Sequence, residues 1–147
     1  MLRILFVCTG NICRSSTAEG LFQHLIKEQG KADLFYVESA GLYDYHAGEA
    51  PDSRTLRVAA EKGIDLSLQR ARKIMADDFY NFDFIFAMDQ GHYQHLVKIC
   101  PRDANCVLKM FIQNQDVPDP WYGSINDFKL VYDIVLKGVK NLLTQFN

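Results

Sequence analysis

The sequence predicts a single α/β domain in which helices cover both faces of a parallel β-sheet. Short apolar runs typical of buried strands alternate along the chain with segments of helical periodicity. The length of 147 residues suits one hydrophobic core, and no repeat, linker or low-complexity segment divides the chain. We therefore expect one domain over residues 1–147, with right-handed crossovers between its strands.

Four segments have the composition of buried strands. Residues 2–7 are apolar on both faces apart from Arg3, as expected of a central strand. The other three are the apolar runs over residues 34–38, 84–88 and 105–110. A turn-rich segment over residues 39–50 follows the second of these runs.

Helical periodicity fills most of the chain between and after these strands. The expected helices cover residues 15–29, a stretch from the cap Asp52 to residue 62, a short turn at 76–80, residues 91–100, and a long final helix from residue 124. Ser124, with Asp127 three positions later, forms an approximate capping box. Gly30 ends the first helix and Pro101 stops the fourth.

Composition excludes several classes of function. The net charge of -2 gives no reason to expect binding to nucleic acid or to a membrane surface. No apolar run approaches the roughly 20 residues of a membrane span, and the run of about six at the N-terminus does not resemble a secretory signal. We therefore expect a cytoplasmic protein with free thiols. The spacing of the four cysteines does not suit zinc.

The most informative segment runs from Cys8 to Ser15, between the first strand and the first helix. The first N–H groups of a helix lack internal partners, and the helix dipole adds positive charge, so this position favours an anion. Gly10 and Asn11 tolerate the positive φ that a concave loop needs. Arg14 offers a planar fork for two phosphate oxygens.

The same field would stabilise a thiolate at Cys8, and Ser15 could donate its hydroxyl to that sulfur. A nucleophile beneath a cradle for tetrahedral oxyanions indicates phosphoryl transfer to sulfur. The alternative is that Cys8 is only a small buried hydrophobe at a strand end. A nucleotide-binding loop is disfavoured, because the chain contains neither of the usual glycine-rich phosphate motifs.

An alcohol or phenol departing from phosphorus also needs a proton donor. Asp119 is the best candidate, since it stands between two prolines in a loop that follows the last strand. Trp121 and Tyr122 could partly desolvate this carboxyl and keep it protonated when substrate binds. The alternative is that the Asp-Pro pair serves only as turn chemistry.

Together these segments resemble the low-molecular-weight protein tyrosine phosphatases. The run Cys-Thr-Gly-Asn-Ile-Cys-Arg-Ser from Cys8 is similar to the family signature, and Asp-Pro-Trp-Tyr-Gly from Asp119 resembles its acid loop. Further matches lie in order between them, at Ser39-Ala40-Gly41, Pro51-Asp52, Gly63-Ile64, Ala71-Arg72 and Ala87-Met88-Asp89. The resemblance implies a four-stranded parallel sheet with helices on both faces and an enzyme that needs no metal and no cofactor.

The resemblance also implies roles for individual residues. Cys8 would attack phosphorus and Asp119 would act as general acid and then as base. Ser15 would stabilise the thiolate, and Asn11 with Ser39 would support the loop. The phosphate would lie against Arg14 and the loop residues Thr9, Gly10, Asn11, Ile12 and Cys13. The walls of a slot for an aryl phosphate would be Tyr45, His46, Trp121 and Tyr122. Cys13 could trap an oxidised Cys8 as a disulfide.

Three positions depart from the family pattern. Ser16 stands where proline, the favoured first residue of a helix, is usual, which would lower the rigidity of the loop slightly. Gln69 replaces a histidine that often helps to brace the loop, which leaves the bracing network in doubt. Trp121 replaces the commoner tyrosine. The expected surface histidines of the helices are His24, His92 and His95.

Two enzymes and one binding module are the alternatives. A thiol-linked arsenate reductase needs a cysteine pair directly after the third strand, where this chain has Ala87-Met88-Asp89. A phosphoarginine phosphatase would resemble this loop with threonine in place of Ile12, whose apolar side chain favours a planar phenol. A non-catalytic phosphotyrosine-binding module would need neither a thiolate nor an acid.

The remaining expectations concern partners. The substrates would be phosphotyrosine-containing proteins, and phosphate and vanadate would inhibit. We expect no nucleic-acid or membrane partner, and a chain that is a monomer or a weak dimer.

Overall fold

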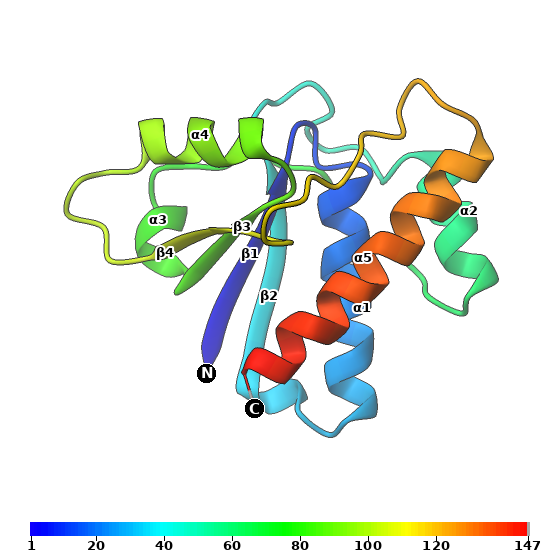
Figure 1. Ribbon diagram of the computed structural model, residues 1–147, viewed down its shortest axis with the longest axis horizontal. Coiled ribbons are helices and arrows are strands. Elements are labelled where there is room, and N and C mark those ends of the chain that lie inside the picture. The colour runs from blue at the N-terminus through cyan, green and yellow to red at the C-terminus, as the bar shows by residue number, and fades with distance from the viewer. Residues whose placement is uncertain (147) are drawn as a thin grey trace.

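The computed structural model describes residues 1–146 and contains one four-stranded sheet with all strands parallel. In space the strands follow the order β2-β1-β3-β4 (Figure 1). Their bounds are Leu2–Cys8 for β1, Phe35–Gly41 for β2, Phe84–Ala87 for β3 and Val107–Met110 for β4. The predicted fold class is confirmed; of the predicted domain, residue 147 lies outside the described part.

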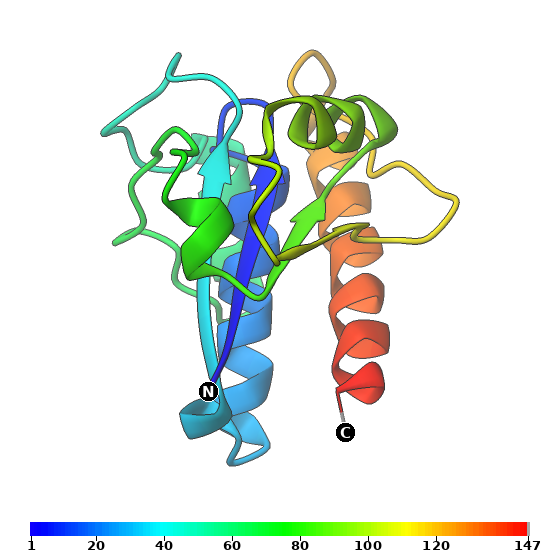
Figure 2. The same ribbon diagram turned by 90° about the vertical axis from the view of Figure 1, so that its left-hand side faces the viewer.

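Helices pack on both faces of this sheet, as Figures 1 and 2 show. On one face lie α1 (Arg14–Glu28), α2 (Ser53–Glu61) and the long α5 (Ile125–Gln145), and on the other lie α3 (Asp78–Asn81) and α4 (Gln90–Ile99). A short 3₁₀ turn, η1 (Ala32–Leu34), precedes β2. Because side chains alternate along β1, Phe6 joins the core under α1 and α5, whereas Leu5 and Val7 join the core under α4.

Two predicted helix starts are found with the expected caps. The Asp52 carboxylate accepts a hydrogen bond from the N–H of Arg54 at 2.8 Å. At the start of α5, Ser124 and Asp127 form the predicted capping box. The other helices begin or end within two residues of their expected positions, as is usual for helix ends.

The second strand differs most from expectation. We predicted a strand over residues 34–38 followed by turns, but β2 starts after Leu34 and continues through Ser39 and Ala40 to Gly41. The reason is pairing: β1 offers partners along its whole length, from Leu2 opposite Phe35 to Cys8 opposite Gly41. Hydrogen bonding to a neighbouring strand thus overrides the turn preference of serine and glycine.

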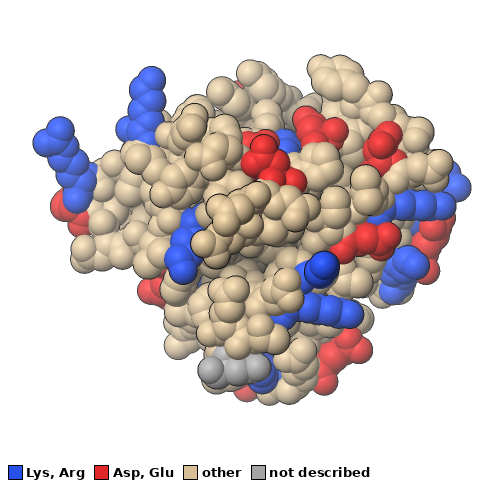
Figure 3. All heavy atoms as spheres, viewed as in Figure 1, with Lys and Arg blue, Asp and Glu red and all other residues tan. Residues whose placement is uncertain are grey.

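The carboxyl ends of the parallel strands point toward one edge of the sheet, where the loops after β1, β2 and β4 gather (Figure 1). Ligands of open α/β sheets bind at such edges. The face in Figure 3 carries charges of both signs without an extended patch of either. No helix within residues 1–146 is long and apolar enough to cross a membrane.

Candidate active site

The loop between β1 and α1 is built around one residue with left-handed backbone conformation. Asn11 has φ of 62°, whereas Gly10, for which we also predicted a positive φ, does not. Glycine at position 10 has a different cause, because a Cβ there would lie 3.0 Å from Cδ2 of His46. The loop therefore has one left-handed residue, and a side chain at position 10 would require the ring of His46 to shift by a few tenths of an ångström.

The side chain of Asn11 holds the loop from three directions. Its Nδ2 donates to Oγ of Ser15 at 2.8 Å and to Oγ of Ser39 at 2.9 Å, and its Oδ1 accepts from the N–H of Arg72 at 3.0 Å. Ser39 in turn donates to Glu19 at 2.8 Å. Asn11 is buried, so each of these bonds is protected from water.

The thiol of Cys8 lies at the bottom of this loop, almost fully buried, with its Sγ 3.0 Å from Oγ of Ser15. Asn11 donates to the same serine oxygen. The hydroxyl hydrogen of Ser15 is therefore free to point at the sulfur, which is the arrangement that stabilises a thiolate.

Arg14 is 4% exposed and is anchored mainly through one nitrogen. Its NH1 donates to Oδ2 of Asp89 at 2.9 Å and to the carbonyl of Val117 at 2.9 Å. Burial opposes ionisation of Asp89, but the hydrogen bonds from His92 N–H and Arg14 prevail and lower the pKa of that carboxyl. Asp89 and Val117 thus bind NH1 of the buried guanidinium, and its other N–H groups are left for an anion.

His92 is not the surface residue that we predicted. It is 5% exposed, and its Nε2 lies 2.8 Å from Oγ1 of Thr9 and 3.4 Å from NH2 of Arg14. The signal was available in the sequence, because His92 stands four residues before Leu96 and so shares the buried face of α4.

Asp119 reaches the same place from the loop after β4. Its Oδ1 accepts from the N–H of Trp121 at 3.1 Å, and its Oδ2 lies 3.8 Å from NH2 of Arg14. The predicted desolvation of this carboxyl is not found, since half of its side chain is exposed. Trp121 and Tyr122 flank the carboxyl without covering it.

Arg54 links the acid loop to the phosphate loop. Its guanidinium pairs with Asp52 at 3.0 Å and donates to the carbonyls of Trp121 at 3.2 Å and Gly123 at 3.4 Å. The N–H of Asp52 donates to the carbonyl of Ile12 at 2.9 Å. The start of α2 therefore bridges the two loops, a connection that the sequence did not reveal.

A cavity of about 200 Å³ joins these parts. Its lining consists of Cys8, Thr9, Gly10, Ile12, Cys13, Arg14, Tyr45, His46, Asp119, Trp121 and Tyr122. All predicted wall residues are among them, and the ring of His46 lies 5.5 Å from that of Trp121. The predicted residues that do not line the cavity, Asn11, Ser15 and Ser39, lie behind the loop and support it.

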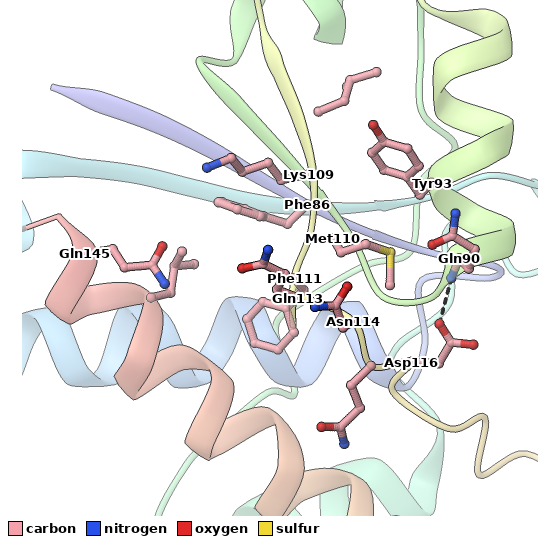
Figure 4. A pocket seen from close by; sticks show the side chains of 13 residues that line it. Phe86, Gln90, Tyr93, Lys109, Met110, Phe111, Gln113, Asn114, Asp116 and Gln145 are labelled. Carbon is pink, nitrogen blue, oxygen red and sulfur yellow. Dashed lines mark hydrogen bonds between the residues drawn. The ribbon is translucent and has the colours of Figure 1, made fainter.

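A larger hollow of about 660 Å³ lies elsewhere, along the edge strand β4 between α4 and α5 (Figure 4). Amide side chains such as Gln90, Gln113 and Gln145 surround it, and Asp116 accepts from the N–H of Gln90 at 2.9 Å. It shares no residue with the smaller cavity. The larger volume therefore does not make this hollow the candidate active site. The smaller cavity is the candidate because chemically active groups converge there.

Comparison with known proteins agrees with this geometry. A family model described as low molecular weight phosphotyrosine protein phosphatase matches residues 3–147. The chain belongs to this family.

Relatives within this family match the chain over nearly its whole length. A low molecular weight phosphotyrosine protein phosphatase of Schizosaccharomyces pombe is 34% identical over 149 residues, covering 97% of this chain and 95% of that protein. A crystal structure of a protein tyrosine phosphatase from Entamoeba histolytica has a TM-score of 0.93 at 34% identity, with 99% and 97% of the two chains covered. The crystal structure of a Drosophila arginine phosphatase has a TM-score of 0.91 at 28% identity, with 99% of this chain and 98% of that chain covered.

The departures from the phosphatase family pattern leave the loop braced. Ser16 donates its hydroxyl to the carbonyl of Cys13 at 3.1 Å, a hydrogen bond that a proline at this position could not form. Gln69 donates to the carbonyl of Ser16 at 3.1 Å and does not contact Asn11 directly. Ser39 and the backbone N–H of Arg72 hydrogen-bond to Asn11 instead.

The two loop cysteines of this phosphatase differ in character. Burial raises the pKa of Cys13 to about 12, so its thiol stays protonated at neutral pH. Cys8, with Ser15 beside it, is the better candidate for a nucleophile. Within the described part of the chain all four cysteines are free. The resolving role implied for Cys13 stays a prediction.

Proposed function

We propose that this phosphatase hydrolyses phosphotyrosine in proteins through a phosphocysteine intermediate on Cys8, with Asp119 as general acid and then base. The observation that carries the proposal is the convergence of Cys8, Arg14 and Asp119 in one small cavity with aromatic walls. A binding module would need the arginine but neither the thiol nor the carboxyl.

In the first step the sulfur of Cys8 attacks phosphorus in line with the departing phenolic oxygen. A P–S bond forms, the P–O bond to the phenol breaks, and Asp119 gives its proton to that oxygen. Arg14 and the loop N–H groups hold the three equatorial oxygens as their charge develops. The hydroxyl of Ser15, 3.0 Å from the sulfur, can donate a hydrogen bond to the attacking thiolate.

In the second step water attacks the phosphocysteine. The Asp119 carboxylate removes a proton from this water, a new P–O bond forms, and the P–S bond breaks. The leaving thiolate returns to the Ser15 hydroxyl, and inorganic phosphate remains. Half-exposure of Asp119 suits both roles, because the carboxyl must meet the leaving group and then the water.

The walls support an aryl substrate. Tyr45, Trp121 and Tyr122 offer flat surfaces to a phenyl ring, and Ile12 presents an apolar edge at the floor. Phosphoarginine is the second candidate, favoured by the likeness to the Drosophila arginine phosphatase. Ile12 offers no hydrogen-bond acceptor to a guanidinium, whereas its apolar side chain can pack against a phenyl ring, which favours the phenol.

The remaining proposals are narrower. The reaction uses no metal and no cofactor, since the loop N–H groups and Arg14 neutralise the phosphate. Phosphate and vanadate would inhibit by occupying the same loop. Free thiols support a cytoplasmic location. We also keep the prediction of a monomer or weak dimer.

Cys8→Ser, with Cys100→Ser as a matched control outside the cavity, tests the assignment. We expect Cys8→Ser to abolish hydrolysis of para-nitrophenyl phosphate in the presence of a metal chelator, and Cys100→Ser to retain it. Rapid quench of wild type with substrate should leave one phosphoryl group on the peptide that contains Cys8. Undiminished turnover by Cys8→Ser would refute the mechanism.

A substrate panel then separates the candidate functions. Phosphotyrosine peptides should be hydrolysed faster than phosphoserine or phosphoarginine peptides of the same sequence. Faster release from phosphoarginine would move the assignment to the second candidate. Thiol-dependent reduction of arsenate would revive the reductase alternative.

A further inference from the structure

A buried imidazole lies directly beneath the phosphate-binding loop and takes no part in the proposed chemistry. His92 is in the first turn of α4, and its N–H donates to Oδ1 of the cap residue Asp89 at 2.8 Å. The residue is 5% exposed and does not line the cavity, but its ring contacts Thr9 and Arg14, which do.

The contacts of the ring define its protonation. Nε2 lies 2.8 Å from Oγ1 of Thr9 and 3.4 Å from NH2 of Arg14. A guanidinium can only donate, so the nitrogen that faces it must be an acceptor. The hydrogen of a neutral ring is then on Nδ1, which lies 3.2 Å from Oδ1 of Asp89 without forming a hydrogen bond to it. Burial and the charge of Arg14 lower the pKa of His92 to about 4, in agreement with a neutral ring.

Thr9 completes the arrangement. With Nε2 as acceptor, the threonine hydroxyl donates to the imidazole, and its oxygen can accept from NH2 of Arg14 at 3.4 Å. The single lone pair of Nε2 therefore accepts mainly from Thr9 at 2.8 Å and is shared with NH2 of Arg14 at the longer distance of 3.4 Å.

The geometry of Arg14 shows why these contacts matter. Asp89 and Val117 both bind NH1, and a guanidinium held at one nitrogen can still pivot about it. On NH2 the contacts are Thr9 and His92 at 3.4 Å and Asp119 at 3.8 Å. Asp119 lies on an exposed loop and must exchange a proton during the proposed reaction. Thr9 and His92 are therefore contacts of NH2 that can persist through the cycle and add to the restraint that Asp89 and Val117 place on NH1.

We propose that His92 is a positioning residue for phosphate binding: its neutral ring, through Nε2, aligns the Thr9 hydroxyl and the NH2 group of Arg14 toward the phosphoryl oxygens. This rests on the proposed function, because it assigns the orientation of Arg14 in that reaction. His92 does not touch the substrate and acts only through Thr9 and Arg14.

Two amide substitutions separate the two ring nitrogens. The amide of glutamine reaches the place of Nε2, whereas the shorter asparagine reaches the place of Nδ1. We expect His92→Gln to keep kcat/KM within about threefold of wild type. We expect His92→Asn and His92→Phe to lower it roughly tenfold to hundredfold, mainly by raising KM and the inhibition constants of phosphate and vanadate. His24→Gln, on the exposed surface of α1, controls for loss of a histidine.

The dependence on leaving group distinguishes this proposal from a failure of the proposed function. Arg14 holds the phosphoryl group whatever its leaving group, so the ratio of kcat/KM for phenyl phosphate and para-nitrophenyl phosphate should be unchanged in the His92 variants. A ratio that shifts would mean that His92 acts through Asp119, and would overturn the proposal. Activity retained by Cys8→Ser would refute the proposed function itself, and this result does not depend on any His92 variant.

The competing explanation for a loss of activity in the His92 variants is a loss of packing. Melting temperatures and the protonation of the ring distinguish the two explanations. Equal losses in the Gln, Asn and Phe variants that follow their melting temperatures would assign His92 to packing and overturn the proposal. If His92→Phe does not fold, the activities of the Gln and Asn variants, whose side chains differ by one methylene, still distinguish positioning from packing. Long-range ¹H–¹⁵N spectra of wild type at neutral pH should show the hydrogen on Nδ1; a ring protonated on Nε2 would also overturn it.

Discussion

Gly41 ends β2 directly opposite Cys8, and the phosphate-binding loop packs against its bare backbone. A Cβ at this position would lie 2.9 Å from the carbonyl oxygen of Thr9, 3.0 Å from the carbonyl carbon of Gly10 and 3.1 Å from the nitrogen of Asn11. On the other side, the N–H of Gly41 donates to Arg72 at 2.7 Å, so the strand cannot withdraw. Gly41→Ala must therefore displace the loop.

The size of the effect follows from these distances. Ordinary carbon contacts lie at about 3.5–4.0 Å, so the loop must move by about 0.5 Å. Overpacking of this kind costs about 1–3 kcal/mol of stability. A displacement of about 0.5 Å is also the limit that catalytic geometry tolerates, and 1 Å costs roughly a hundredfold in rate. We expect kcat/KM for Gly41→Ala to fall about tenfold.

Steady-state kinetics with para-nitrophenyl phosphate and unfolding in urea measure the two effects. Gly91→Ala is the matched control, because its Cβ would meet only Oδ1 of Asp89, at an ordinary 3.4 Å. This helical position should gain up to about 1 kcal/mol from alanine without a change in kcat/KM. A Gly41→Ala protein with wild-type activity and stability would refute the argument that the loop rests rigidly on β2.

Three further predictions concern the acid loop and the buried histidine. Asp119→Asn should lower kcat/KM for phenyl phosphate by roughly 10²–10⁴ and less for para-nitrophenyl phosphate, whose leaving group needs less protonation; equal losses in this kinetic comparison would contradict the acid role. Arg54→Met should release the carbonyls of Trp121 and Gly123 and lower kcat/KM roughly fivefold to thirtyfold with the same leaving-group bias, and a loss without bias would mean that Arg54 does not act through Asp119. Because the pKa of His92 falls from 6.5 to about 4 on folding, in a setting shared with Arg14, Asp89, Asp116 and Asp119, the unfolded chain binds the extra proton between these values. The free energy of unfolding should therefore decrease as pH falls through this window, and urea titrations of His92→Gln should show a weaker dependence; an unchanged slope would exclude His92 as its source.

The sequence predicted the order of strands and helices along the chain and the caps at Asp52 and Ser124. It also predicted that Cys8, Arg14 and Asp119 converge. Each depends on local physics. Alternating strand and helix patterns dictate parallel strands whose carboxyl ends share an edge, and this places a loop after β1 beside a loop after β4. The type of residue then determines the chemistry, since a thiol, a guanidinium and a carboxyl are recognisable wherever the chain brings them together.

Contacts between distant segments account for what the sequence did not reveal. The length of β2 depends on its pairing with β1, and the need for glycine at position 41 depends on a loop about 30 residues earlier. The spacing of His92 and Leu96 indicates that His92 lies on the buried face of α4, but only the folded chain brings Thr9 and Arg14 into contact with its ring. Periodicity along one helix reports which face is apolar and not which polar group another segment will bring to it. The nature of the catalytic groups is therefore a property of the sequence, whereas the support of Arg14 by His92 and of the acid loop by Arg54 exists only in the folded chain.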